Sequence, residues 1–228
     1  MRRLLNTAHR GLHRIAASPH GHAHTATRDP GGMGINGKQY DRLSGRLLSG
    51  LYRRAAGEAD RAPRGGVVAD IGTGPGRLLL AIAGRRPDLE PHGIDVSPDM
   101  VERARHNAAA GGFGDRITVH LADAAHLPLG DGAADLVVST LSMHHWGDVP
   151  AAVREVARVL RPGGRFVVYD FRAVPDTPLT GAVATAPEFA GARVERTLVS
   201  AAPWIPFPLF ARLSVERPAG PSGTTAVH

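Results

Sequence analysis

From residue 67 onward the chain alternates continuous apolar runs with segments in which apolar residues recur at helical spacing. The continuous runs predict five strands, over 67–70, 90–95, 117–121, 136–140 and 166–169. Apolar positions three and four residues apart predict helices between them, over 77–84, after Ser97 and over 149–160. Strands that alternate with helices are typical of a parallel sheet with helices on both faces, so we expect an α/β fold.

Polar residues stand where two of these helices should begin. Ser97 precedes Pro98, and Asp148 precedes the helix predicted over 149–160. Short polar side chains are favoured at the N-cap because they accept a hydrogen bond from a free backbone N–H, and proline is favoured at the first helical position. We therefore expect Ser97 and Asp148 to cap their helices.

The two ends of the chain are less regular than its middle. Residues 193–200 and 209–216 alternate enough to predict a closing antiparallel pair, and 180–190 predicts a short helix. Near the other end, leucines at helical spacing over 41–55 predict a helix. These patterns divide the chain into a flexible basic tail (1–37), a helical cap and linker (38–66), a main domain (67–218) and a disordered tail (219–228).

Composition narrows the class of function. The chain has no cysteine, which excludes disulfides, thiolate metal sites and cysteine nucleophiles. Residues 1–65 carry 12 basic against 4 acidic side chains, whereas the rest carries 15 against 17. The main domain is therefore mildly acidic, and we expect no nucleic-acid partner and no metal site. No apolar run reaches the length of a membrane-spanning helix, so we expect a cytoplasmic protein without stable membrane insertion.

A glycine-rich turn follows the first predicted strand. Residues 70–76 (DIGTGPG) space their glycines as G-x-G-x-G, with Asp70 two residues before the first. Glycines allow positive φ and a close approach of a ligand to the backbone. A dinucleotide-binding turn would need its third glycine at Arg77, and Asp70 would repel a pyrophosphate. The turn instead suits a cofactor that carries an ammonium group and no phosphate.

Candidate ligand contacts follow the other strands as well. Ligands of open α/β sheets bind at the carboxyl ends of the strands. Asp95 ends the second strand, 19 residues after Gly76, where an acid can accept hydrogen bonds from ribose hydroxyls. Asp123 and the N–H of Ala124 follow the third strand and could contact an adenine ring. The fourth strand runs into 140–146 (TLSMHHW).

Five stretches of the chain match one family in order and spacing. They are VVADIGTGPGRL, GIDVSPDM, ADAAHLPL, DLVVSTLSMHHW and VLRPGGRFVVYD, and they cover about residues 67–170. Together they resemble the class I S-adenosylmethionine-dependent methyltransferases, in the small-molecule branch that includes ubiquinone and menaquinone biosynthesis enzymes. The resemblance implies a Rossmann-like, doubly wound, mostly parallel seven-stranded sheet with an antiparallel closing strand. It implies S-adenosylmethionine as the cofactor and in-line transfer of its methyl group to a small, apolar or aromatic molecule.

The resemblance also implies roles for individual residues. The methionine end of the cofactor is expected at Asp70, Gly72, Gly74 and Gly76, the ribose at Asp95, and the adenine at Val96, Asp123 and Ala124. Tyr40 is expected to close over the cofactor, and Thr140 to contact it from the fourth strand. The substrate-contacting residues are expected to be Leu141, His144, His145 and Trp146.

His144 is the candidate general base, because a histidine can take a proton near neutral pH. The alternative is that His144 or His145 only packs or caps near Asp148. Two other functions also stay open. One is a nicotinamide-dependent oxidoreductase, which Asp70 and Arg77 disfavour, and the other is a regulatory protein that binds S-adenosylmethionine without catalysis.

Overall fold

The computed structural model describes residues 48–200 and 207–219 of the 228-residue chain. The chain divides into two compact units, residues 1–46 and 47–228, and the described residues all belong to the second. Residues 48–56 are helical, so the helix predicted over 41–55 is seen from its middle onward. Tyr40, the basic tail and most of the predicted C-terminal tail lie outside the described residues.

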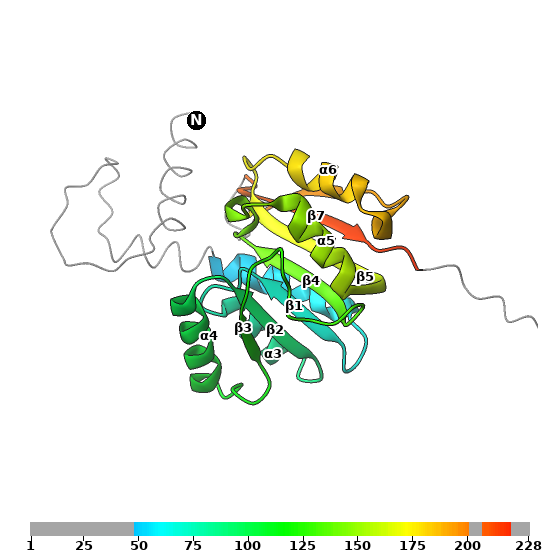
Figure 1. The fold of residues 1–228 in the computed structure, drawn as a ribbon. Coiled ribbons are helices and arrows are strands. Elements are labelled where there is room, and N and C mark those ends of the chain that lie inside the picture. Colours follow the sequence, from blue (N-terminus) through cyan, green and yellow to red (C-terminus); the bar gives the residue numbers. More distant parts are fainter. Residues whose placement is uncertain (1–47, 201–206, 220–228) are drawn as a thin grey trace, which may run out of the picture. The chain divides into compact units, whose positions relative to one another are not determined.

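Seven strands of the described chain form one sheet, in the order β3-β2-β1-β4-β5-β7-β6 (Figure 1). They are β1 (Val67–Ile71), β2 (Glu90–Asp95), β3 (Thr118–Leu121), β4 (Ala134–Thr140), β5 (Leu160–Phe171), β6 (Glu195–Val199) and β7 (Phe210–Glu216). Only β7 runs antiparallel to its neighbours β5 and β6, and the remaining pairs are parallel. The predicted α/β fold with an antiparallel closing strand is confirmed.

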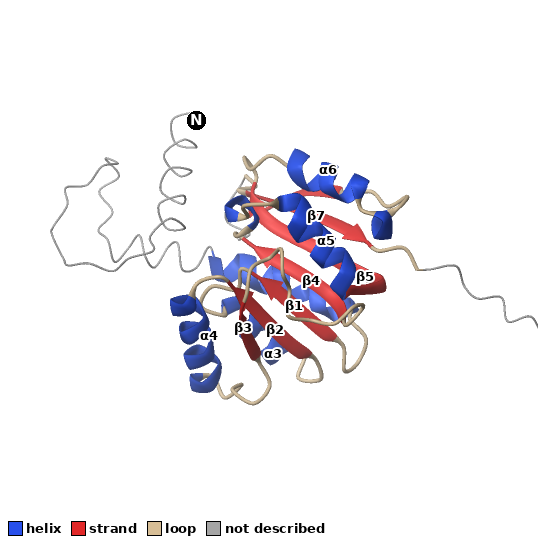
Figure 2. Cartoon of the chain, in the orientation of Figure 1, coloured by secondary structure: helices blue, strands red, loops and turns tan. Residues whose placement is uncertain are grey.

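Helices cover both faces of this sheet. They are α3 (Arg77–Arg85), α4 (Pro98–Ala110), α5 (Val149–Val159) and α6 (Thr177–Thr185), with short 3-10 turns η1 (Gly57–Arg61), η2 (Met143–His145) and η3 (Pro187–Phe189). In Figure 2, α5 and α6 lie in front of the sheet and α3 lies behind it. Within the described ranges, no helix combines the length and apolar character that crossing a membrane requires.

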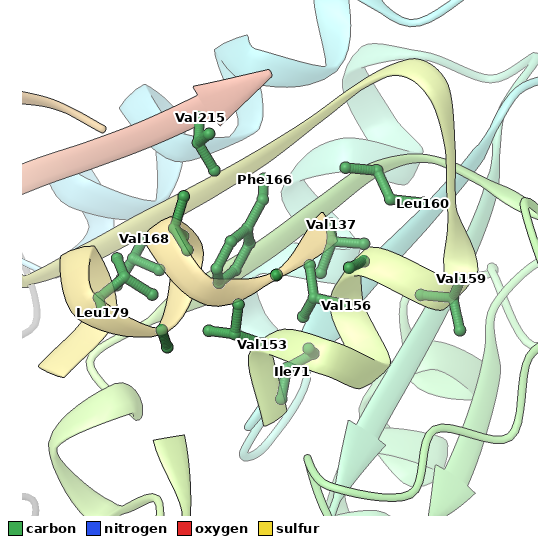
Figure 3. Close-up of a cluster of buried hydrophobic side chains, with 14 of the residues drawn as sticks. Ile71, Val137, Val153, Val156, Val159, Leu160, Phe166, Val168, Leu179 and Val215 are labelled. Atoms are coloured by element: carbon green, nitrogen blue, oxygen red, sulfur yellow. The ribbon is translucent and has the colours of Figure 1, made fainter. Parts of the chain in front are cut away.

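The larger core lies between the sheet and α5 and α6. Phe166 of β5 points toward Val153 and Val156 of α5, and Leu179 of α6 closes the same layer (Figure 3). All four side chains are at most 1% exposed. Each contributes about 1.5–3 kcal/mol by leaving water. A second core joins α3 and α4 to β3 on the opposite face.

One of the two predicted helix caps is confirmed, and one predicted helix lies at a different place. Ser97 occupies the N-cap of α4 but its side chain makes no cap bond, and the Ser97 N–H instead donates to Asp95 Oδ1 at 3.0 Å. Asp148 does cap α5, because its Oδ1 accepts from the Ala151 N–H at 2.8 Å. The helix predicted over 180–190 lies earlier, at Thr177–Thr185, and Pro187 prevents its continuation because proline disfavours helical backbone in the residue before it.

Strand β5 begins six residues before its predicted start. The strand already pairs with β4 at Leu160, and a register shift lets it pass through Pro162-Gly163-Gly164. The Gly163 N–H donates to Arg217 O and the Arg217 N–H donates to Gly164 O, both at 2.9 Å. Apolar pattern alone misses this segment, because backbone pairing and not side-chain burial holds it in the sheet.

Candidate active site

The strand order reverses between β1 and β4, which places a crevice at the carboxyl ends of these two neighbours. Strands to one side of β1 run β2 then β3, and strands to the other side run β4 then β5. Open α/β sheets bind their ligands at such a switch point. The glycine turn after β1 and the segment after β4 therefore belong to one site.

The glycine turn is shaped by positive φ angles and by a close neighbour. Gly72, Gly74 and Gly76 have φ of 70°, 53° and 78°. A Cβ on Gly72 would lie 2.2 Å from Ser142 Oγ, so no larger residue fits there. A Cβ on Gly74 would meet no described atom within 4 Å. Gly72 therefore lets the turn after β1 touch the loop after β4, and Gly74 leaves backbone open to a ligand.

Asp70 is a buried carboxylate with unused bonding capacity. It is 1% exposed, and its Oδ2 accepts a hydrogen bond from Thr73 Oγ1 at 2.7 Å. Its Oδ1 is buried without a hydrogen-bond partner among the described residues. Burial raises the pKa of Asp70 to about 7; the Thr73 bond opposes this rise and the nearby Asp95 adds to it. A cation at Oδ1 would satisfy the atom and favour its ionised form.

Asp95 faces the same turn from the end of β2. Its Oδ2 accepts from the Gly74 N–H at 2.8 Å, which ties the glycine turn to the neighbouring strand. Beside it, Val96 is 69% exposed and Leu121 of β3 is 56% exposed. Exposed apolar side chains next to a carboxylate form a surface on which a flat ring attached to a sugar can pack. The chemistry of these residues fits a ribose with an adenine beyond it.

Asp123 and Ala124 lie on the turn just past β3. Asp123 is exposed, and its Oδ1 accepts from the Ala125 N–H at 2.8 Å. Ala124 is half-buried and packs on the core. Both residues therefore lie just past the carboxyl end of β3, and their contact with an adenine stays a prediction.

The segment after β4 is held in an unusual backbone conformation. Leu141 has φ of 57°, a left-handed conformation that costs a non-glycine residue about 1–3 kcal/mol, and its N–H donates to Tyr169 O at 2.7 Å. Ser142 Oγ donates to Ile71 O at 2.9 Å, which joins the loop to β1. The neighbouring Thr140 Oγ1 is buried without a hydrogen-bond partner in the described part of the chain. Such strain at a strand end is typical of functional sites.

His144 forms a buried pair with Asp170 at the end of β5. Its Nδ1 lies 2.8 Å from Asp170 Oδ1 and 3.0 Å from Oδ2, and its backbone N–H donates to Oδ2 at 3.2 Å. The two side chains are only 8% and 3% exposed. The Phe171 N–H also donates to Asp170 Oδ1 at 2.8 Å, which fixes the carboxylate. The arrangement orients the imidazole through Nδ1.

The other predicted substrate residues differ in position. His145 is exposed, with its ring 4.0 Å from that of His144, and Leu141 is half-buried. The Trp146 ring stacks on Phe166 at 6.4 Å and belongs partly to the core. The structure therefore brings Leu141, His144 and His145 together at the strand ends and turns Trp146 toward the core.

Sequence reasoning missed two residues of this site. Asp170 ends the fifth strand, so the rule that located Asp95 could have found it. Tyr52 lies on the helical segment before β1, close to Asp70 and Arg77; burial and Asp70 raise the pKa of its phenol, and Arg77 lowers it. No sequence signal points to Tyr52, because its proximity to Asp70 arises only in the folded chain.

Comparisons with known proteins match the central part of the chain to one family. Residues 69–168 match the family described as "Methyltransferase domain". The chain is 39% identical over 134 residues to the 27-O-demethylrifamycin SV methyltransferase of Amycolatopsis mediterranei, which is 59% of this chain and 46% of that protein. It is 37% identical over 142 residues to the demethylmenaquinone methyltransferase of Thermus thermophilus, which is 60% and 63% of the two chains.

Residues 69–168 are a class I S-adenosylmethionine-dependent methyltransferase domain. The fold agrees: the geranyl diphosphate C-methyltransferase of Streptomyces coelicolor A3(2), solved with S-adenosyl-L-homocysteine, shares it with a TM-score of 0.64. That comparison covers 87% of this chain and 91% of that one, at 13% identity. The methyltransferase domain takes S-adenosylmethionine as its cofactor. The chain spans about half the length of the first curated relatives it matches.

Proposed function

We propose that the chain transfers a methyl group from S-adenosylmethionine to a hydroxyl group of a small, apolar or aromatic molecule. The observation that carries the hydroxyl assignment is the His144–Asp170 pair. A neutral amine can attack through its own lone pair, whereas a neutral hydroxyl is a weak nucleophile and gains from a base. A mildly acidic main domain and the absence of cysteine support a small-molecule partner in the cytoplasm.

Asp70 is proposed to hold the ammonium of the cofactor's amino-acid end. Its buried Oδ1 lacks a partner in the described chain, and the open backbone at Gly74 lies in the same turn. Asp95 is proposed to accept from the ribose hydroxyls, with Val96 and Leu121 packing on the adenine. S-adenosylmethionine, when bound, supplies an electrophilic methyl group on a positively charged sulfur. The chain's task is then to orient the acceptor and exclude water.

His144 is proposed to act through Nε2. When Nδ1–H donates to Asp170, the tautomer places the lone pair on Nε2, and the carboxylate stabilises the imidazolium that forms. Nε2 would take the proton of the acceptor hydroxyl as the acceptor oxygen attacks the methyl group that the bound cofactor would supply, with S-adenosylhomocysteine as the leaving group. Asp170 is a positioning residue, since it acts through the imidazole.

The surroundings of the pair support an apolar acceptor. The Phe171 ring lies 5.7 Å from the His144 ring, and the Phe210 ring lies 5.7 Å beyond Phe171. Leu141 adds an aliphatic side chain at the same edge. One relative is named 27-O-demethylrifamycin SV methyltransferase, and this name indicates that the other enzyme methylates an oxygen atom.

The test is a turnover assay that follows formation of S-adenosylhomocysteine with a panel of small phenols, alcohols, amines and quinols. We expect turnover with hydroxyl compounds and calorimetric binding of S-adenosylmethionine but not of NAD. Binding of NAD alone would restore the oxidoreductase hypothesis. Turnover confined to amines or carbon acceptors would refute the hydroxyl assignment, and tight cofactor binding with no turnover on any class would favour a regulatory binder.

A further inference from the structure

A cavity of about 260 Å³ is lined by residues of β5, β6 and β7 and of the segments beside them. It is lined by Arg61, Arg165, Ala192, Arg193, Glu195, Arg212, Ser214, Val215 and Glu216. Arg165 lies five residues before Asp170 on β5, which is about 16 Å along an extended strand. Arg165 also lies opposite Leu136, near the start of β4. None of the lining residues is one of the proposed cofactor contacts or a member of the His144–Asp170 pair.

Arg165 is a buried cation with part of its guanidinium unused. The residue is 9% exposed, and its Nη2 donates to Glu58 Oε2 at 2.6 Å. Its Nη1 is buried and has no hydrogen-bond partner among the residues described. A buried charged donor without an acceptor costs more than about 1–3 kcal/mol. An oxyanion in the cavity would supply that acceptor.

The neighbouring Arg212 lines the cavity, but its guanidinium is already bonded to other protein side chains. Its Nε donates to Glu58 Oε1 at 2.7 Å, and its Nη1 donates to Ser214 Oγ at 2.7 Å. The cavity's two other arginines, Arg61 and Arg193, are exposed, and neither side chain makes a hydrogen bond or ion pair within the described ranges. Three arginines therefore have donors available for a ligand.

The charges around the cavity favour an anion that also carries hydroxyl groups. Four arginines face three carboxylates, namely Glu195 and Glu216 in the lining and Glu58 behind it, which leaves one surplus positive charge. Glu58 is already used by Arg165 and Arg212. Glu195 and Glu216 can accept hydrogen bonds from a ligand's hydroxyls. The volume exceeds that of a phosphate ion and leaves room for a small body attached to it.

We propose that this cavity binds the phosphate group of a small hydroxylated metabolite. The forked guanidinium of Arg165 holds phosphate oxygens from the buried side, and Arg61 and Arg193 close over them from the rim. The same cavity could also take free inorganic phosphate, since the recognised group is identical.

The test is calorimetric titration of the full chain with inorganic phosphate, glycerol 3-phosphate and glycerol, at matched ionic strength. We expect glycerol 3-phosphate to bind more tightly than phosphate, and glycerol not to bind. Tighter binding of inorganic phosphate would identify the free ion as the ligand. Absence of binding by both phosphate compounds would overturn the proposal.

The matched variants are R61Q/R193Q and the control R103Q, which removes an exposed arginine of α4. We expect R61Q/R193Q to weaken phosphate binding at least about tenfold, the effect of one charge-assisted hydrogen bond, and R103Q to leave it unchanged. Equal weakening by R103Q would mean non-specific attraction and refute the site. S-adenosylmethionine binding should be the same in all three proteins. Its loss in R61Q/R193Q alone would show that these arginines act on the whole fold, which would also refute the proposal.

Discussion

At the scale of single residues, Asp70 couples cofactor binding to protonation. Its pKa of about 7 in the cofactor-free protein lies above the usual value of 3.8. The unfolded chain therefore releases this proton at a lower pH than the folded chain, and the free energy of unfolding falls as pH rises from about 4 to about 7. An ammonium placed at Oδ1 favours the ionised form and lowers that pKa. The affinity for S-adenosylmethionine should therefore increase with pH through neutrality, with release of a proton on binding.

The measurement is calorimetry at pH 7 in two buffers that differ in ionisation enthalpy. We expect release of about half a proton per cofactor bound, and none in D70N, whose affinity should fall by about 10–100-fold. D99N, which changes an exposed acid at the start of α4, serves as the control. A binding enthalpy that is independent of the buffer would exclude Asp70 as the partner of the ammonium.

His144 and Asp170 act as a pair, and their variants should separate catalysis from binding. H144A is expected to lower kcat by about 10²–10⁴-fold on a hydroxyl acceptor, with the Kd for S-adenosylmethionine unchanged. D170N should also lower kcat without changing KM, because it alters the tautomer of His144. Added imidazole should restore part of the activity of H144A, and H106A on the surface of α4 should behave as wild type. A normal kcat in H144A would show that His144 is not the general base.

At the scale of elements, the turn after β1 and the loop after β4 pack so closely that a substitution in one affects the other. G72A places a Cβ 2.2 Å from Ser142 Oγ at a φ of 70°, so we expect a loss of about 2–4 kcal/mol in the free energy of unfolding. G74A meets no described atom and should lose about 1–2 kcal/mol, yet weaken cofactor binding at least tenfold. Urea unfolding and calorimetry measure the two effects. G72A/S142G should recover part of the stability, and failure to recover it would place the strain elsewhere.

The cap of α5 is a second prediction at this scale. Asp148 Oδ1 accepts from the Ala151 N–H, and the helix carries the core residues Val153 and Val156. D148A should lower the free energy of unfolding by about 1 kcal/mol, whereas D148N should retain most of it. Equal losses in both variants would show that charge, and not the accepted hydrogen bond, stabilises the helix start.

At the scale of the whole molecule, Glu58 connects segments that are distant in the sequence. It lies on η1 and accepts from Arg165 and Tyr169 of β5 and from Arg212 of β7. These hydrogen bonds lower the pKa of Glu58 to about 2 against the opposing effect of burial. The stabilisation is therefore complete above pH 4.5 and is lost as pH falls toward 2.

E58Q should destabilise the protein by about 3 kcal/mol at pH 7, because it leaves the buried Arg165 and the partly buried Arg212 without their carboxylate. The difference in stability between wild type and E58Q should shrink as pH falls from 5 to 3. The measurement is urea unfolding across that range, with the exposed E102Q as control. A constant difference between pH 7 and pH 3 would show that packing, rather than charge, links η1 to the sheet.

The amino-acid sequence by itself determined the succession of strands and helices along the chain, the glycine turn, and the acids at the ends of β1, β2 and β3. These features are local: periodicity follows from which face is buried, and a turn's glycines follow from its φ angles. Most of the candidate cofactor contacts could be proposed from the sequence because they lie at or just after the end of a strand.

The tertiary structure alone decided which distant residues meet. Asp170 of β5 pairs with His144, and Trp146 turns toward Phe166 and the core. Tyr52, on the helical segment before β1, lies near enough to Asp70 for that carboxylate to raise the pKa of its phenol. The extension of β5 through residues 162–164 likewise depends on backbone bonds to Arg217, just past β7, and the Arg165 cavity forms only where β5, β6 and β7 come together. Such contacts are set by strand order and packing, which no spacing along the chain encodes.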